Sequence, residues 1–563
     1  MGNILQLKQM DEKFFTFFIG FAFLYGILSY QHYAPSYHDF YIHAVVFLFC
    51  SIGGFFAFYR KKIKIYFSNL AWLFIFLVLL LQPILNNIVY VDGLVFPLAI
   101  ILLMFFLSVA VSNVIDKEKL IENMALILIV GAVLLLLTQM VHVFNFSTVI
   151  DLMKLPLQKE RFSGNLFQPN QTAFVFVLGI VSSMFYIKNN ILKNIILFFL
   201  SVGVAFTISR SGFLILIFCV ILFNGMQNHY NKIALMKLKE SFFCLIGLIC
   251  GVLAYPHFSQ TTTLVERTAS SFEDPRISLL YQSWLNISEH PITGVGWKNF
   301  TGTGLTYFEK LKWFSSADHS HFFVSQLLSE FGLLGLVILV LFIYILIKNI
   351  KKISGIAESY VALVLFVILI YSCFEFPLWE FKYLMVFSIF LSLFDRDDKP
   401  FYFLNKGYLF SLVFCVFSIV SCYYYFQYKE LAKVFNLMVD DNVGINEKAR
   451  EIIGLKPVFG FGFFNDIMAY EIIAEGNFSL EEKIVLGGKI VNYFPTYPYL
   501  VRHATFLAMN KNTETAIYYF SASCQYEFHH RCNETKEYLK SLSEQNPIEF
   551  KVIYSTIKDK YKN

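Results

Sequence analysis

The chain has 563 residues, of which 57% are apolar and 15% are charged, and its formal net charge is +5. Long stretches lack the polar surface that a soluble globule needs, so the composition excludes a soluble protein. It predicts an all-α polytopic membrane protein, in which the placement of Lys and Arg matters more than their sum.

A membrane-spanning helix needs about 20 mainly apolar residues to cross the hydrocarbon core. About thirteen segments meet this requirement, near residues 14–30, 40–59, 70–90, 94–114, 121–141, 172–187, 193–209, 211–224, 241–255, 321–347, 360–376, 380–394 and 407–427. The first segment has no small-residue cleavage site, so we expect a retained span rather than a signal peptide.

The loops between these segments alternate in charge. Clustered Lys and Arg occur in alternate loops, at residues 60–64, 117–119, 188–193, 232–239, 348–352 and 396–406. The short loops 31–39 and 86–93 contain no Lys or Arg. Because cytoplasmic loops carry the excess of positive charge, we expect a cytoplasmic N-terminus. The segments 142–171 and 256–320, and the chain after about residue 428, then lie outside.

Polar groups near the outer ends of the spans are functional candidates, since a charge in mid-bilayer costs about 2.5 to 3.5 kcal/mol on insertion scales. The stretch R161-F-S-G-N-L-F-Q-P-N-Q171 ends directly at a span. Its Gly, Pro and Asn content predicts a turn and a helix cap, with Asn170 suited to cap the helix and Gln168 offering an amide. Arg210 lies in T207-I-S-R-S-G212 between two spans, where an interface anchor is the alternative role.

The longest outer loop contains a second group of candidates. Arg276 begins a helix-like stretch, and Trp297 ends the Gly-rich piece P291-I-T-G-V-G-W297. His319 and His321 stand just before an apolar run. Because a histidine titrates near neutrality, it can remove a proton from an attacking hydroxyl, which is typically worth about 10² to 10⁴ in rate.

Two carboxylates belong to the same region. Glu330 lies nine residues after His321, where a buried structural hydrogen bond is the favoured role, and Glu375 precedes Pro377 in a tight outer turn. Arginine binds phosphate oxygens bidentately and stays charged at the membrane edge, so the arginines, histidines and amides together indicate a lipid-linked phosphate. No carboxylate cluster accompanies the histidines in the sequence, so we expect chemistry without a metal or cofactor.

Beyond about residue 429 the hydropathy falls and helical periodicity takes over. Ser479 and Glu482 match an S-x-x-E capping box, which is a helix-start signal. The alternating helices suggest a hairpin array that is tetratricopeptide-like but lacks a clean repeat of about 34 residues. Such an array either binds protein segments or forms a helical cap with no ligand. Cys524 and Cys532 are close enough in sequence to pair in an oxidising compartment.

These segments, in this order, resemble the O-antigen ligase / Wzy superfamily, and within it the PglL-type protein O-oligosaccharyltransferases of bacteria. The resemblance covers most of residues 150–395. It rests on five pieces, namely G164-N-L-F-Q-P-N-Q-T-A173, S209-R-S-G212, the loop from Arg276 through P291-I-T-G-V-G-W297, S320-H-F-F-V-S-Q-L-L-S-E-F-G-L-L-G335 and E375-F-P-L. The family commonly has His-Asn at the span start, whereas here His321 is followed by Phe322. The groups available to orient the histidine are then Ser320, Ser325 or Gln326.

The resemblance implies en bloc transfer of an oligosaccharide from undecaprenyl diphosphate to a Ser or Thr hydroxyl of pilin or another exported protein, by metal-independent inversion in the periplasm. His321 matches the essential histidine of the family, Arg210 and Arg276 match arginines associated with the pyrophosphate, and Gln168 matches the glutamine before Pro-Asn. We add two contacts for pyrophosphate or glycan, Arg161 and Asn170. Four further residues are expected to support the site, namely His319, Glu330, Glu375 and Trp297.

We expect a multi-pass protein of the bacterial inner membrane, with a periplasmic active face. A multi-span domain at 1–428 contains a ligase-like core at about 150–395, including the periplasmic loop 256–320, and 429–563 form a periplasmic helical domain. Expected partners are the lipid-linked oligosaccharide, the acceptor protein and membrane lipids, and no nucleic acid. The alternatives are an O-antigen ligase acting on lipid A core and an O-antigen polymerase. A lipid-linked sugar transporter is disfavoured, because the charges gather at the outer edge and the halves do not repeat.

Overall fold

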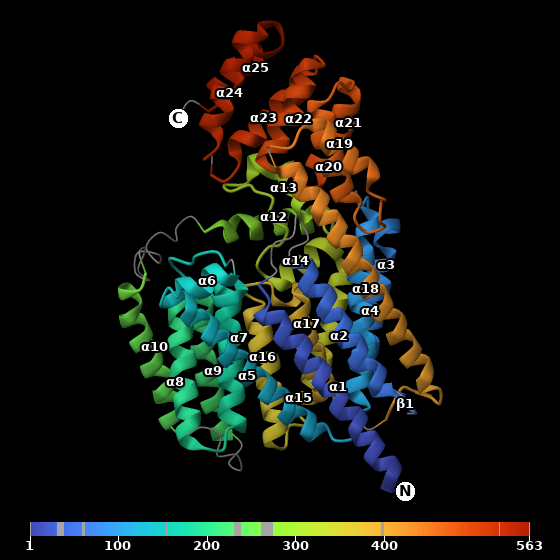
Figure 1. The fold of residues 1–563 in the computed structure, drawn as a ribbon, viewed down its shortest axis with the longest axis vertical. Helices are drawn as coiled ribbons and strands as arrows, with labels where there is room; N and C mark the ends of the chain where they lie inside the picture. Colours follow the sequence, from blue (N-terminus) through green and yellow to red (C-terminus); the bar gives the residue numbers. More distant parts are fainter. Residues whose placement is uncertain are drawn as a thin grey trace. The chain divides into compact units, whose positions relative to one another are not determined.

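The computed structural model describes residues 2–30, 39–58, 62–153, 155–229, 238–259, 274–395, 399–440, 442–528 and 530–561 (Figure 1). The α-helices are α1 (Gly2–Leu28), α2 (Phe40–Phe58), α3 (Phe67–Leu85), α4 (Val95–Ser112), α5 (Lys117–Val143), α6 (Ser147–Met153), α7 (Pro169–Tyr186), α8 (Asn190–Phe206), α9 (Arg210–His229), α10 (Leu238–Ala254), α12 (Pro275–Glu289), α13 (Phe300–Tyr307), α14 (Phe323–Phe331), α15 (Leu333–Ile350), α16 (Ile356–Tyr371), α17 (Phe381–Phe394), α18 (Gly407–Val439), α19 (Ile445–Gly454), α20 (Gly462–Glu475), α21 (Leu480–Tyr493), α22 (Tyr497–Met509), α23 (Thr513–Gln525), α24 (Cys532–Gln545) and α25 (Pro547–Lys560). The 3₁₀ helices are η1 (Val91–Leu94), η2 (Gly164–Leu166), η3 (Tyr255–His257), η5 (Phe308–Lys310) and η6 (Pro377–Trp379). The strands are β1 (Ile63–Ile65) and β2 (Tyr402–Leu404), which pair antiparallel with Ile63 opposite Leu404.

The chain divides into two compact units that alternate along the sequence. The first unit comprises Met1–Ile75, Ile100–Glu273 and Val340–Phe426, and the second comprises Phe76–Ala99, Asp274–Leu339 and Gln427–Asn563. The second unit therefore contains the C-terminal helices together with the segment that carries Arg276 and both histidines.

The prediction of an all-α polytopic membrane protein is confirmed. Each of the predicted spans overlaps a helix. Within the described ranges, seven helices are long and apolar enough to cross a membrane, and four shorter apolar helices accompany them. The apolar composition of these segments explains the agreement, because helices satisfy their own backbone groups where water is excluded.

One predicted span is broken. Residues 321–347 form α14 and α15, which are separated at Gly332, where φ is +55°. Two N–H groups of the loop 292–296 donate to the carbonyls of Ser329 and Glu330, at 2.9 and 3.0 Å, and the first N–H of α15 donates back to a carbonyl of this loop at 3.0 Å. Unpaired backbone groups are costly at membrane depth, so a span can break only where other groups satisfy it. The loop 292–296 supplies the hydrogen-bonding partners for the backbone groups at the break.

The C-terminal helices form three successive hairpins, α20/α21, α22/α23 and α24/α25 (Figure 1). The helices α20, α22 and α24 begin 35 residues apart, and α21, α23 and α25 begin 33 and 34 residues apart. This is the spacing of a tetratricopeptide-like array, which the hydropathy did not show clearly. The capping box of Ser479 and Glu482 is present at the start of α21. A disulfide between Cys524 and Cys532 links the last two hairpins.

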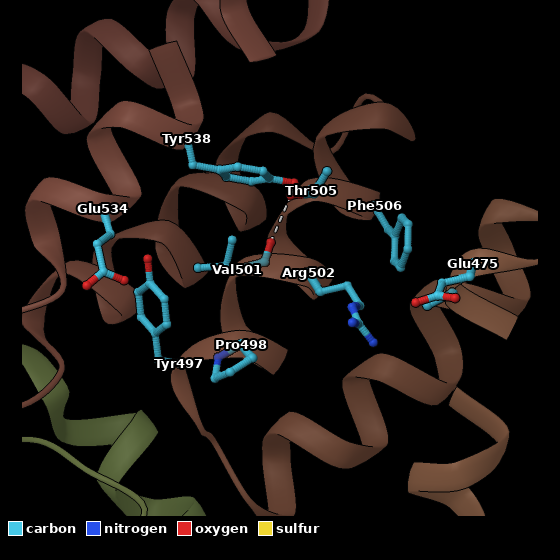
Figure 2. A pocket seen from close by; sticks show the side chains of 10 residues that line it. Glu475, Tyr497, Pro498, Val501, Arg502, Thr505, Phe506, Glu534 and Tyr538 are labelled. Atoms are coloured by element: carbon cyan, nitrogen blue, oxygen red, sulfur yellow. Dashed lines mark hydrogen bonds between the residues drawn. The ribbon is translucent and has the colours of Figure 1, made fainter. Parts of the chain in front are cut away.

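The first helix of each hairpin contributes to one cavity of about 450 Å³ (Figure 2). Its lining includes the aromatic side chains of Tyr497, Phe506 and Tyr538, together with Arg502 and Glu475. Because every second helix lines it, this cavity lies on one face of the array, which is the face that helical-repeat proteins use for extended ligands.

Candidate functional site

Several predicted residues of the first unit meet around Asn170. The Asn170 Oδ1 accepts hydrogen bonds from the Arg161 guanidinium at 3.3 Å and the Ser209 hydroxyl at 2.8 Å. The Asn170 Nδ2 donates to the Glu375 carboxylate at 2.6 Å. Ser209 and Glu375 are buried. These four residues, named here the Asn170 cluster, connect the segment before α7, the first turn of α7, the residue before α9 and the turn after α16.

Gln168, not Asn170, caps α7. The Gln168 side-chain oxygen accepts from the backbone N–H of Asn170 at 2.7 Å and of Gln171 at 3.4 Å. The expectation that Asn170 caps this helix was wrong, because Pro169 occupies the first helical position and moves the cap to the preceding residue. The Asn170 amide is thereby left to bridge the cluster. Arg210 is the first residue of α9 and directly follows Ser209.

Strained backbone conformations occur at or next to several candidate residues. Ten non-glycine residues in the described part of the chain have positive φ, and five of them are Arg161, Phe167, Ile208, Lys298 and His321. Such conformations cost of order 1 to 3 kcal/mol each and persist only where the surroundings impose them. A β-branched residue such as Ile208 is a true outlier there. The turns that carry Arg161, Gln168, Arg210 and His321 are therefore held in fixed shapes.

In the second unit, the two histidines belong to a chain of polar contacts. The Lys298 ammonium lies 2.8 Å from one carboxylate oxygen of Asp318, and the other oxygen lies 2.6 Å from His319 Nδ1. The rings of His319 and His321 are in contact, with centroids 4.4 Å apart. We name Lys298, Asp318, His319 and His321 the Asp318 cluster.

The charges of this cluster stabilise one another. Burial by itself would raise the pKa of the Asp318 carboxyl, but the Lys298 ammonium and the His319 hydrogen bond hold that pKa well below its usual range. Burial by itself would lower the pKa of Lys298, yet the Asp318 carboxylate raises it. In both groups the interactions with neighbouring opposite charges together outweigh the effect of burial. A carboxylate that faces Nδ1 keeps a proton there, which leaves Nε2 of neutral His319 as an acceptor.

A network of short polar side chains fixes the backbone before α14. The Ser320 N–H donates to Gln326 Oε1 at 2.8 Å, and the hydroxyls of Ser320 and Ser325 lie 2.8 Å apart. Ser320 and Gln326 are buried, and His321 between them has φ +58°. All three residues named from the sequence as possible orienting groups thus act together on the turn that presents His321.

Glu330 and Trp297 position the Gly-rich loop against the broken span. Glu330 is 1% exposed, and its Oε1 accepts from the backbone N–H of Lys298 at 3.0 Å. The Trp297 ring lies 5.9 Å from the Phe331 ring, measured between centroids. Both contacts help to place Lys298, which in turn contacts Asp318.

Arg276 lies in the first turn of α12, where the Asp274 side chain accepts from its backbone N–H at 3.1 Å. The buried Asn286 of this helix donates to the Ser329 hydroxyl of α14 at 2.9 Å, so α12 packs directly on the helix that follows His321. The predicted residues therefore form two groups. The first unit holds Arg161, Gln168, Asn170, Arg210 and Glu375, and the second holds Arg276, Trp297, His319, His321 and Glu330.

Sequence reasoning missed three members of these clusters. Ser209 and Asp318 each stand next to a residue that the sequence did single out, so their position beside Arg210 and His319 was an available signal. Lys298 likewise directly follows Trp297, but its contact with Asp318 depends on the fold of the Gly-rich loop.

One group of three described residues has the donor atoms for a metal ion. Ligand atoms of Asp39, His43 and Glu380 lie within 4.8 Å of one another. The buried Lys382 ammonium lies 2.9 Å from Glu380 and 3.4 Å from Asp39. Since this ammonium already lies against both carboxylates and neutralises one of their two charges, we assign no metal to the group.

Two family models match the chain. A model described as O-antigen ligase matches residues 195–340, and a model described as virulence factor membrane-bound polymerase, C-terminal, matches residues 359–536. The first range contains Arg210, Arg276 and both histidines. No curated protein matches the chain.

Proposed function

Because the chain belongs to the O-antigen ligase / Wzy superfamily, whose members are membrane enzymes that act on lipid-linked sugars, we propose that it is a PglL-type protein O-oligosaccharyltransferase. In this proposal it transfers an oligosaccharide en bloc from undecaprenyl diphosphate to Ser or Thr hydroxyls of exported proteins. The enzyme lies in the inner membrane with its active face in the periplasm.

The Asp318 cluster is the observation that carries this proposal. A hydroxyl is a poor nucleophile until a base removes its proton. In the proposed step the acceptor oxygen attacks the anomeric carbon while its proton passes to His321. The bond from that carbon to the diphosphate oxygen breaks at the same time, so the configuration inverts and undecaprenyl diphosphate leaves. His319, held by Asp318, orients the His321 ring through their contact.

The arginines are proposed to stabilise the charge of the leaving group. Negative charge grows on the diphosphate as the bond breaks, and a guanidinium stabilises it through paired hydrogen bonds. Arg210 and Arg276 take this role. The Asn170 cluster holds Ser209, and so the start of α9, in place. Arg161 and Gln168 stand at the same entry to α7 and are proposed to contact pyrophosphate or glycan.

Replacing Arg276 by alanine is expected to lower kcat for transfer about 10²-fold, since removal of one charge-stabilising donor typically costs that much. Arg276→Lys keeps the charge but not the paired geometry, so it should retain more activity than Arg276→Ala. The measurement is transfer from purified lipid-linked oligosaccharide. Equal activity of the two variants would show that Arg276 is merely structural.

Replacing Asp318 by asparagine is expected to lower kcat about 10- to 100-fold, because a hydrogen bond to a charged group is worth roughly 1.5 to 3 kcal/mol. The amide still fills the space but cannot hold the His319 proton in the same way. KM for the lipid donor should change little, since Asp318 acts through His319. An unchanged kcat would remove Asp318 and His319 from the mechanism.

Two observations support the proposed orientation of the chain in the membrane. β1 and β2 lie in two loops that the charge pattern assigns to the cytoplasm, and their pairing requires both loops to lie on one side. The disulfide of Cys524 and Cys532 suits an oxidising compartment, such as the periplasm proposed for the tail.

The rival functions differ in the molecule that accepts the oligosaccharide. The cavity on the face of the hairpin array favours a polypeptide acceptor. The matches to ligase and polymerase models favour transfer to lipid A core or to another glycan. Purified enzyme should therefore be given the lipid-linked oligosaccharide with candidate acceptor proteins, and the modified residue mapped. In a deletion strain, loss of glycopeptides with intact lipopolysaccharide supports the proposal, and the opposite result assigns the ligase function.

A further inference from the structure

The helix α12 exposes its apolar side chains. Ile277, Leu280, Tyr281 and Trp284 are 64%, 41%, 46% and 62% exposed. Leu280, Tyr281 and Trp284 follow Ile277 by three, four and seven residues, which places the four side chains in one stripe along the helix. A stripe of this composition is normally the buried side of a helix in a soluble protein.

The opposite side of α12 is polar and buried. It carries Ser278, Gln282, Ser283 and Asn286, and Leu279 is the one apolar residue buried with them. Gln282 donates to the Phe300 carbonyl of α13 at 2.6 Å, and Asn286 donates to Ser329 of α14. The amphipathic pattern of α12 is therefore inverted: its mainly polar side makes the contacts within the protein, and its apolar stripe faces outward.

The location of α12 indicates what meets the stripe. The helix α14, on which α12 packs, begins the segment Phe323–Ile350, which is apolar enough to cross a membrane. A helix attached to the first turns of such a segment lies at the end of a span, where hydrocarbon gives way to headgroups. Trp and Tyr are enriched at this depth, because their rings have one apolar and one polar end.

We propose that α12 lies in the membrane–water interface, with the stripe Ile277, Leu280, Tyr281 and Trp284 in contact with bilayer lipid. The stripe contains no charge, so it binds through apolar contact between headgroups and acyl chains rather than through headgroup charge. One consequence rests on the proposed function: the interface would hold Arg276, at the start of α12, at the depth of a lipid-linked diphosphate.

Tryptophan fluorescence of the full-length protein in phosphatidylcholine nanodiscs tests this contact. The chain has five tryptophans, and the difference in emission between wild type and Trp284→Phe isolates Trp284. Lipid brominated near the headgroup end of its acyl chains should quench about half or more of this difference emission, since interfacial helices insert roughly 5 to 10 Å. Aqueous iodide should quench it little. Because Trp284 is mostly exposed and phenylalanine is similar in shape, the variant should fold.

Leu280→Gln provides a second measurement, since it weakens the stripe without touching Trp284. It should increase iodide quenching of the Trp284 emission. Strong iodide quenching in wild type, with no effect of brominated lipid, would overturn the proposal. The stripe would then contact water or a protein instead of lipid. Stronger quenching by lipid brominated near the methyl ends would overturn it as well, because the helix would then be deeply inserted. Neither result depends on whether the enzyme glycosylates protein.

Discussion

Replacement of His321 by alanine is expected to reduce kcat for glycan transfer about 10²- to 10⁴-fold, the usual contribution of a general base. The thermal stability of the purified protein should change little, because the hydrogen bond from the Ser320 N–H to Gln326, which fixes the turn around His321, remains in the variant. Transfer from purified lipid-linked oligosaccharide to an acceptor protein is the measurement. Unchanged glycosylation would contradict the assignment of His321 as the base.

Two further variants sharpen this test. His321→Asn removes the imidazole with less disturbance of the backbone, because asparagine tolerates the left-handed conformation that His321 adopts at φ +58°. Its kcat should fall as far as that of His321→Ala. His319→Ala should have a smaller effect, since His319 is proposed to orient His321. If His319→Ala were the more damaging of the two, the Asp318-bound histidine would be the base.

Replacement of Gly294 by alanine is expected to destabilise the protein by roughly 2 kcal/mol or more, since a left-handed L-residue alone costs about 1 to 2 kcal/mol. Gly294 has φ +67°, and a Cβ there would overlap the backbone of Glu330. That backbone cannot move freely, because its carbonyl accepts a hydrogen bond from the same loop. The thermal midpoint of the purified protein and transfer activity should therefore fall together, unlike in the His321 variants.

Gly454→Ala is a matched control for this prediction. Gly454 ends α19, and a Cβ there would meet no atom within 4 Å. Alanine is a better helix former than glycine, so this variant should be as stable as wild type or slightly more stable. If Gly294→Ala melted at the same temperature as Gly454→Ala, the contact between the loop 292–296 and the broken span would not hold the site together.

Local patterns were enough to predict the helices. Each apolar segment is long enough to cross a membrane, and helices are the structures that satisfy the backbone there. Several candidate residues were named one at a time from short motifs. Arg161, Asn170 and Glu375 were selected separately, and the structure brings them into contact. The capping box of Ser479 and Glu482 was predicted because it depends only on neighbouring residues.

The sequence by itself determined the membrane class of the protein, its helical content and the segments that carry the candidate chemistry, because these follow from composition and short-range spacing. Only the tertiary structure decided which groups meet. Asn170 and Glu375 are 205 residues apart, and Lys298 and Asp318 are 20 apart. The break at Gly332 likewise depends on the loop 292–296, and the outward side of α12 depends on α13 and α14. The physical reason is that a hydrogen bond or an exposed face is a property of two segments, and no single segment contains it.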